Sequence, residues 1–189
     1  MLTEERKVEI KTNYLSLLDR IGLKETLEPL LESLNYFEQP ATAQYNGAYA
    51  GGLAEYALLL CRELGTLCNL YYPGVYADAD IIKVALLKEI YRAQMYEVFN
   101  RNVKNEETGQ WEALKAYRTK EVRPVYGDLG FSSYMILKNY IDLTDEQIEA
   151  IIHTTGIASN SVDIYAVLKA YPLVTLTRMA SDVVNYLKQ

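Results

Sequence analysis

A lysine and a glutamate stand side by side within the most apolar part of the chain. Lys88 and Glu89 fall in the stretch 84–92, which reads VALLKEIYR. Adjacent side chains on a helix point about 100° apart, so we expect at least one of the two to point toward the interior. Lysine and glutamate are seldom fully buried unless they are paired. Two interpretations stay open: both side chains reach water from a half-buried helix, or they meet inside the protein.

The other residue types that carry catalysis give no recognisable pattern. Gly47, Gly51 and Gly52 match neither a P-loop nor a dinucleotide-binding fingerprint, and the chain has no nucleophile elbow. One histidine, His153, and two cysteines do not make up a zinc site. Residue types and spacing therefore predict no metal and no cofactor, and no enzyme class emerges from them.

Length and charge restrict the remaining possibilities. A chain of 189 residues, half of them apolar, predicts one domain with a sizeable core over 1–189. The net charge of −6 argues against general nucleic-acid binding, which needs a basic face. No apolar run is long enough for a signal peptide or a membrane span. We therefore expect a cytoplasmic protein with no membrane partner.

The elements that hold these residues are expected to be mostly helices. Apolar residues spaced three and four apart predict helices over 4–20, 24–36, 53–70, 80–99, 131–141, 144–153, 163–170 and 172–187. The stretch 37–52 is rich in small residues and glycines and is almost uncharged. This composition predicts either a loop close to a ligand or a tight connection packed on helices. Residues 100–125 are polar and predict a β-hairpin or a long excursion.

Five stretches, in order along the chain, resemble a known family. They are 45–56 (YNGAYAGGLAEY), 85–92 (ALLKEIYR), 125–130 (VYGDLG), 150–156 (AIIHTTG) and 171–182, which begins YPLV and ends MASD. Together they resemble HD-domain phosphohydrolases, especially the small phage and bacterial type. The resemblance covers about 37–188 and implies an all-α, HD-domain-like helical bundle, to which 1–36 adds an N-terminal helical pair. It also implies phage origin, and hence the host cytoplasm or the virion as the location.

The same resemblance implies that the family's metal ligands are replaced. A metal-binding histidine falls on Tyr56, and the His-Asp pair that names the family falls on Lys88 and Glu89. The other ligand positions fall on Asn46, Thr154, Ser181 and either Leu129 or, with a shifted gap, Asp128. Divalent metals need imidazole and carboxylate ligands in fixed geometry, and the ammonium of Lys88 would repel a cation. We therefore expect a metal-free pseudoenzyme.

Three functions follow from this resemblance and stay open. In the first, a structural or inhibitory protein binds a protein partner, or a second copy of itself, through its surface. In the second, the former active-site pocket binds a nucleotide or another phosphate ligand without hydrolysing it. Its expected lining is Asn46, Tyr49, Tyr56, Lys88, Glu89, Arg92, Thr154 and Arg178. In the third, a residual phosphohydrolase holds a metal through Glu89, Asp128, His153 and Asp182.

Overall fold

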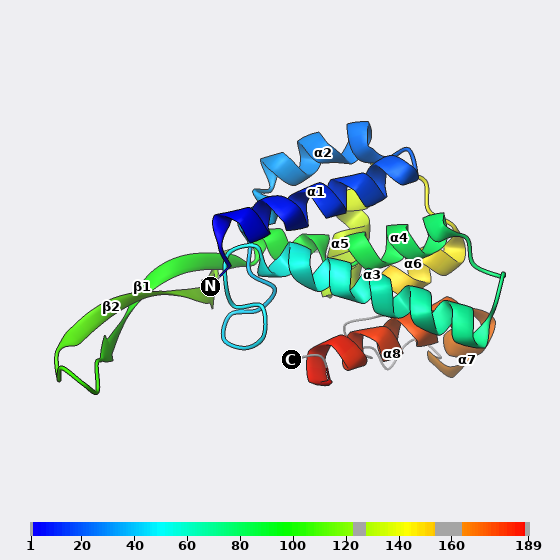
Figure 1. Ribbon diagram of the computed structural model, residues 1–189. Coiled ribbons are helices and arrows are strands. Elements are labelled where there is room, and N and C mark those ends of the chain that lie inside the picture. Colours follow the sequence, from blue (N-terminus) through cyan, green and yellow to red (C-terminus); the bar gives the residue numbers. More distant parts are fainter. Residues whose placement is uncertain (1, 123–127, 154–163, 188–189) are drawn as a thin grey trace.

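The computed structural model describes residues 2–122, 128–153 and 164–187, and these form a helical body with one projecting β-hairpin (Figure 1). The α-helices are α1 (Glu4–Arg20), α2 (Lys24–Ser33), α3 (Gly52–Tyr71), α4 (Asp78–Leu87), α5 (Leu129–Leu137), α6 (Asp145–Ile152), α7 (Ile164–Ala170) and α8 (Pro172–Tyr186). Two short 3-10 helices are η1 (Tyr36–Glu38) and η2 (Ile90–Gln94). The mainly helical class and the hairpin are confirmed, whereas the HD-like arrangement and the single-domain division stay predictions.

Helix α3 lies in the middle of the body. Helices α1, α4 and α8 all pack against it, and Figure 1 shows α1 and α2 on one side of it and α8 on the other. Its apolar residues recur at helical spacing. Four of them are fully buried, namely Leu53, Ala57, Leu60 and Leu64. None of the described helices is long and apolar enough to cross a membrane.

Two buried tyrosines attach the N-terminal helices to the end of α4. Tyr14 of α1 and Tyr36 of η1 are fully buried, with ring centroids 5.3 Å apart. Both hydroxyls donate to the carbonyl oxygen of Leu86, at 2.7 Å and 3.4 Å. This carbonyl belongs to the last turn of α4, where backbone acceptors lose their partners within the helix. The tyrosines therefore satisfy a buried acceptor where the helix ends.

The expected helix over 80–99 is wrong beyond Leu87. After α4 the chain tightens into η2 and then enters the first strand at Tyr96. In a 3-10 helix the residues i and i+3 eclipse one another, and this places Arg92 against Glu89, whose two side chains form an ion pair. Tertiary contacts thus end the helix although the apolar pattern continues. The helix expected over 24–36 also ends early, at Ser33, because Asn35 adopts a left-handed conformation with φ of 50°.

The hairpin starts and ends earlier than the predicted 100–125. Strand β1 (Tyr96–Lys104) pairs antiparallel with β2 (Trp111–Thr119), and Tyr96 stands opposite Thr119. The turn is held by the Asn105 side-chain oxygen, which accepts the backbone N–H groups of residues 107 and 108 at 2.9 Å and 3.1 Å. Figure 1 shows this hairpin, here called the hairpin arm (residues 96–119), reaching away from the helical body.

The stretch 37–52 is a tight connection. The backbone N–H of Ala41 donates to the carbonyl oxygen of Gly47 at 2.8 Å. The same carbonyl lies where a side chain at Gly52 would be, because a Cβ there would stand 2.2 Å from it. Gly47 and Gly51 both have positive φ angles, of 78° and 86°, which glycine adopts without a steric penalty. The glycines thus let the loop fold back onto the start of α3.

Two glycines of α3 give a matched test of this packing. We expect Gly52→Ala to lower the free energy of unfolding by about 1–3 kcal/mol, since the added methyl group requires a backbone shift. At Gly65 the same methyl group would meet the Ile81 side chain at 4.0 Å, an ordinary contact. Gly65→Ala should therefore raise stability by up to about 1 kcal/mol through helix propensity. Urea unfolding of both variants checks this, and equal effects would contradict it.

Candidate functional site

Lys88 and Glu89 meet inside the protein. Their exposed fractions are 1% and 4%, and Lys88 Nζ lies 2.5 Å from Glu89 Oε1. The second carboxylate oxygen, Oε2, accepts from Nε of Arg92. The expectation that at least one side chain points inward is confirmed, and the interpretation in which both reach water is wrong. We call Lys88, Glu89 and Arg92 the buried ion-pair cluster.

The cluster draws together parts of the chain that are far apart in sequence. Arg92 Nη1 donates to the backbone carbonyl of Ala41 at 2.9 Å and to the Tyr96 hydroxyl at 3.2 Å. Lys88 Nζ lies 5.9 Å from the centre of the Tyr56 ring, within reach of a cation–π interaction. The cluster therefore joins the end of α4 to the 37–52 loop, to α3 and to the first residue of the hairpin arm.

The charges of the cluster fix its protonation. Burial by itself raises the pKa of Glu89, but the neighbouring cations of Lys88 and Arg92 outweigh it and lower this pKa to about 2. Burial lowers the pKa of Arg92, and the Glu89 carboxylate reverses this and raises it. A general base works best with a pKa near the operating pH. Glu89 is far from that range, and both its oxygens already accept hydrogen bonds from cations.

A small cavity lies on the surface nearby. It has a volume of about 270 Å³, and three residues expected to line the former active-site pocket, Asn46, Tyr49 and Tyr56, do line it. Lys88, Glu89 and Arg92 do not appear in its described lining, which contains no lysine or arginine. The expected pocket is therefore divided into an open part with tyrosine and amide groups and a closed part with the charges.

A carboxylate that the sequence did not single out also lines this cavity. Glu55 Oε2 accepts from the Tyr49 hydroxyl at 2.7 Å, and Oε1 accepts from Arg6 at 3.1 Å. Burial, and then the contact with Glu55, raises the pKa of Tyr49 to about 12. The only signal in the sequence was the position of Glu55 next to Tyr56. A negative group at this place disfavours a phosphate ligand.

The other expected ligand residues are dispersed. Arg178 is half-buried on α8, and no ion pair or hydrogen bond joins it to a described residue. Asp182 is exposed further along the same helix. Thr154 lies outside the described residues, as do residues 125–127 of the expected 125–130 loop.

Two remaining candidates of the metal-dependent alternative act at helix ends. Asp128 caps α5, and its Oδ1 accepts the backbone N–H of Phe131 at 2.8 Å. His153 is the C-terminal cap of α6, with Nε2 at 2.8 Å from Glu149 Oε2. Among residues 2–122, 128–153 and 164–187, no three or more His, Cys, Asp or Glu side chains gather in a way that would hold a metal ion.

Comparison of the chain with protein-family models, with curated proteins and with solved structures gives no match. The resemblance to HD-domain phosphohydrolases therefore stays a prediction that rests on the residues of the five stretches alone.

Replacing the buried carboxylate tests the cluster. Glu89→Gln leaves two cations close together without a counter-charge, and we expect a loss of about 3–5 kcal/mol in the free energy of unfolding. Glu32→Gln is the matched control, because Glu32 pairs with Lys11 at a site where 53% of the Glu32 side chain is exposed. That change should cost less than about 1 kcal/mol. Urea unfolding at pH 7 measures both, and a similar cost at the two sites would contradict the role of burial.

The same carboxylate predicts a pH dependence. Its pKa falls from 4.5 to about 2 on folding, so its stabilising effect is complete above pH 4.5 and is lost as the pH falls toward 2. We therefore expect the stability difference between the wild-type protein and Glu89→Gln to be constant above about pH 5 and to shrink at lower pH. Unfolding of both proteins between pH 7 and pH 3 measures it, and a difference that does not change with pH would refute this linkage.

Proposed function

We propose that this chain is a non-catalytic, HD-like protein that acts by binding a protein partner through its hairpin arm. One observation carries the proposal: the arm exposes large apolar side chains, and the most exposed of them, Trp111, lies far from the body that could have buried it. Phage origin is part of the proposal and rests on the resemblance alone.

The state of the buried ion-pair cluster supports a role without catalysis. The resemblance assigns the family's His-Asp pair to Lys88 and Glu89, and here these side chains neutralise each other. The guanidinium of Arg92 occupies the remaining carboxylate oxygen. Both oxygens already accept from cations, and the neighbouring ammonium and guanidinium repel divalent metals.

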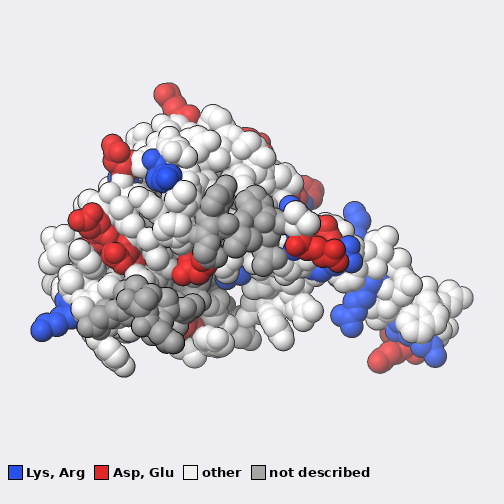
Figure 2. Space-filling view, turned by 180° about the vertical axis from the view of Figure 1, so that it is seen from behind, with Lys and Arg blue, Asp and Glu red and all other residues white. Residues whose placement is uncertain are grey.

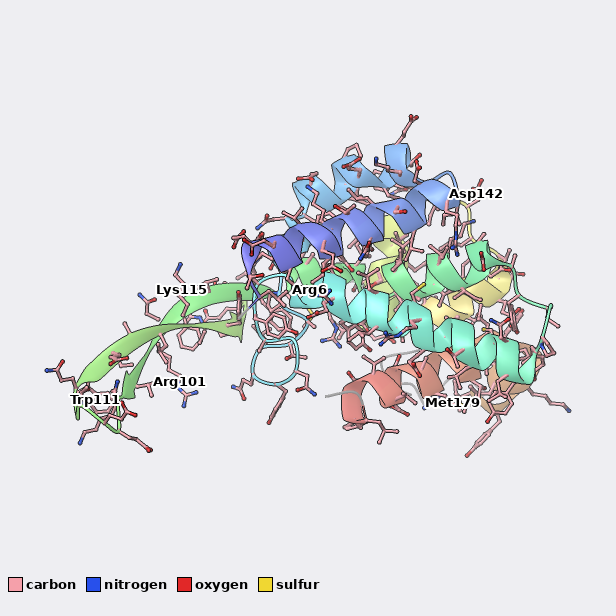
Figure 3. All side chains as sticks on the ribbon, in the orientation of Figure 1. Arg6, Arg101, Trp111, Lys115, Asp142 and Met179 are labelled. Carbon is pink, nitrogen blue, oxygen red and sulfur yellow. The ribbon has the colours of Figure 1, made fainter. Side chains whose placement is uncertain are left out.

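The exposed residues of the arm support a role in binding. Trp111 is 70% exposed, Val98 56% and Leu114 50%. Figure 3 shows Trp111 at the far end of the arm, well away from the helices. Tryptophan is strongly enriched among the residues that dominate binding energies at protein interfaces. An isolated two-stranded hairpin is also only marginally stable in water, so an arm of this kind gains order from a partner.

Nucleotide binding in the former active-site pocket is supported less well. The cavity of about 270 Å³ brings together Asn46, Tyr49 and Tyr56, as that alternative requires. However, Lys88 is 1% exposed, and Arg92 is held by Glu89, Ala41 and Tyr96. The two cations best placed to hold a phosphate are therefore engaged within the protein.

A photoreactive amino acid at position 111 tests the proposal. In cells that produce the chain, we expect irradiation to yield protein adducts from position 111. The control position is Val8, which is also apolar and 65% exposed but lies on α1. Adducts from both positions alike, or from neither, would overturn the assignment of binding to the arm.

A thermal-shift screen against nucleotides, with Mn²⁺ or with EDTA, tests the competing function. A nucleotide at a hundredfold excess over its dissociation constant would stabilise the folded chain by about 2.7 kcal/mol. We expect no shift in either buffer. A shift in EDTA that disappears in Tyr49→Phe would instead favour a nucleotide-binding pocket, and a shift that depends on Mn²⁺ would favour a residual phosphohydrolase.

A further inference from the structure

We propose that the small cavity of about 270 Å³ binds a primary alkylammonium ion, held by the Glu55 carboxylate and by tyrosine rings. The cavity is lined by the 37–52 loop, the first half of α3 and the end of α8. The ammonium group can belong to a free amine or to the end of a lysine side chain. This site is separate from the hairpin arm, so it goes beyond the proposed function and is tested independently of it.

The cavity offers one kind of charge. Of the described residues that line it, Glu55 is the only one with a formal charge, and its side chain is 17% exposed. A carboxylate that is largely removed from water attracts a cation more strongly than an exposed carboxylate does. The described lining therefore favours a cationic ligand over an anion such as phosphate.

The Glu55 carboxylate can accept a further donor. Its Oε2 accepts from the Tyr49 hydroxyl at 2.7 Å, and its Oε1 accepts from Nη2 of Arg6 at 3.1 Å. A carboxylate has about four lone-pair sites, so about two of them remain for a ligand. Arg6 also pairs with Glu9, and its side chain is 46% exposed. An ion pair as exposed as this is weak, so the guanidinium of Arg6 competes only weakly with a ligand.

Three tyrosines supply aromatic walls. Tyr45, Tyr49 and Tyr56 line the cavity, and no ring contact joins them to one another or to another described aromatic ring. The face of a tyrosine ring attracts an ammonium ion, and the ring also packs against the methylene groups beside it. Tyr56 already has a cation near it, since Lys88 Nζ lies 5.9 Å from the centre of its ring. Glu89 neutralises that lysine, which limits its repulsion of a second cation.

The loop adds a second acceptor on another side of the cavity. Asn46 lines the cavity, and its Nδ2 donates to the backbone carbonyl of Asn185 at 3.4 Å. No described residue donates to the remaining amide oxygen of Asn46. An ammonium group has three N–H donors, which suits a carboxylate on α3 together with an amide oxygen on the loop.

The loop is held in place before a ligand arrives. The Thr42 hydroxyl accepts the backbone N–H of Tyr45 at 3.2 Å and donates to the backbone carbonyl of Asn46 at 3.0 Å. This turn fixes the backbone of two residues that line the cavity. Pre-organisation of this kind lowers the entropic cost of binding.

The size of the cavity limits the ligand. Pockets for drug-sized molecules usually measure about 300–1,000 Å³, and this cavity of about 270 Å³ lies just below that range. A short alkylammonium therefore fits it better than a nucleotide does.

The charge of the whole body also favours a cation. Residues 96–119 contain four basic and four acidic residues, so the rest of the chain carries the entire net charge of −6. Figure 2 shows Asp and Glu side chains at several places over the helical body. A negative field raises the local concentration of cations around the protein.

Calorimetric titration of the full-length chain at pH 7 tests the charge of the ligand. Pentylammonium, 1-pentanol and pentanoate share an alkyl chain and differ in charge. We expect pentylammonium to bind at least about tenfold more tightly than pentanol, because charge-assisted hydrogen bonds and cation–π contacts add to the same apolar contacts. Pentanoate should not bind. Equal binding of pentanol, or no binding of pentylammonium, would overturn the proposal.

Three variants locate the site. Glu55→Gln removes the charge but can still accept from the Tyr49 hydroxyl, and it should weaken pentylammonium binding at least about tenfold. Arg6→Gln removes the competing guanidinium and should strengthen binding by about threefold, whereas a merely structural role of Arg6 predicts no gain. Arg20→Gln is the matched control, because Arg20 is also an exposed arginine and pairs with Asp78, which does not line the cavity. This control should leave the affinity unchanged.

A fourth variant excludes loss of folding as the cause of weaker binding. Tyr45 is 81% exposed, so Tyr45→Ala removes an aromatic wall without opening the core, and it should also weaken pentylammonium binding. Unchanged affinity in Glu55→Gln and Tyr45→Ala, or no gain in Arg6→Gln, would contradict the site.

A blocked tripeptide with a central lysine identifies the source of the ammonium group. If it binds more tightly than pentylammonium, the ligand is the lysine side chain of a protein. If it binds more weakly, the ligand is a free amine. Either result supports the ammonium site, and neither depends on adducts from position 111.

Discussion

The Glu89 carboxylate, held between Lys88 and Arg92 inside the body, is the contact on which much of this structure depends. A buried carboxylate is costly unless both its oxygens are paired, and here each oxygen has its own cation. Helix α4 ends at Leu87, and Arg92 pairs with Glu89 from the 3-10 helix η2 that follows. Nη1 of the same Arg92 guanidinium donates to the backbone carbonyl of Ala41 and to the hydroxyl of Tyr96. The path of the 37–52 loop and the start of the hairpin arm both follow from this arrangement.

The end of α4 creates a second requirement, which the N-terminal helices meet. The Leu86 carbonyl would be an unsatisfied buried acceptor once the helix ends, and such a group costs about 1–3 kcal/mol. Tyr14 and Tyr36 both donate to it, and Phe37 packs edge-on against both rings. Residues 1–36 therefore do more than cover an apolar face, because they supply polar partners to the segment that carries the ion-pair cluster. Burial of these hydroxyls raises the pKa of Tyr14, which keeps it a hydrogen-bond donor.

Local patterns predicted the fold where local forces decide it. The spacing of apolar residues placed α1 and α3 well, and a capping box of Thr144 with Gln147 starts α6 where the helix over 144–153 was expected. The segment after Leu87 could not be predicted in this way, because its apolar residues fit a longer helix equally well. Two long-range hydrogen bonds accompany the end of that helix. Arg92 donates to the carbonyl of Ala41, 51 residues away, and the carbonyl of Leu86 accepts from the hydroxyl of Tyr14, 72 residues away. Partners at such distances leave no mark on a local pattern.

The candidate site shows the same division. The meeting of Lys88 and Glu89 inside the protein was one of two interpretations that their place in an apolar stretch left open, and Arg92 was expected to line the same pocket. The sequence could not show that these three would satisfy one another so fully. A lysine in an open pocket binds an anion, whereas a lysine held 2.5 Å from a carboxylate and 1% exposed is part of the core. Burial therefore separates the two roles, and burial is a tertiary property.

The hairpin arm and the ion-pair cluster are physically connected. Tyr96 begins β1, lies 7% exposed, and its hydroxyl accepts from Arg92, so the start of the arm is anchored to the buried ion-pair cluster. Lys120, just beyond β2, donates its backbone N–H to the carbonyl of Met95 at 2.8 Å. An arm fixed at the start of β1 and just beyond β2 loses little orientational freedom when it binds, and pre-organisation of this kind reduces the entropic cost of association. In this chain the buried ion-pair cluster thus helps to hold the hairpin arm in place.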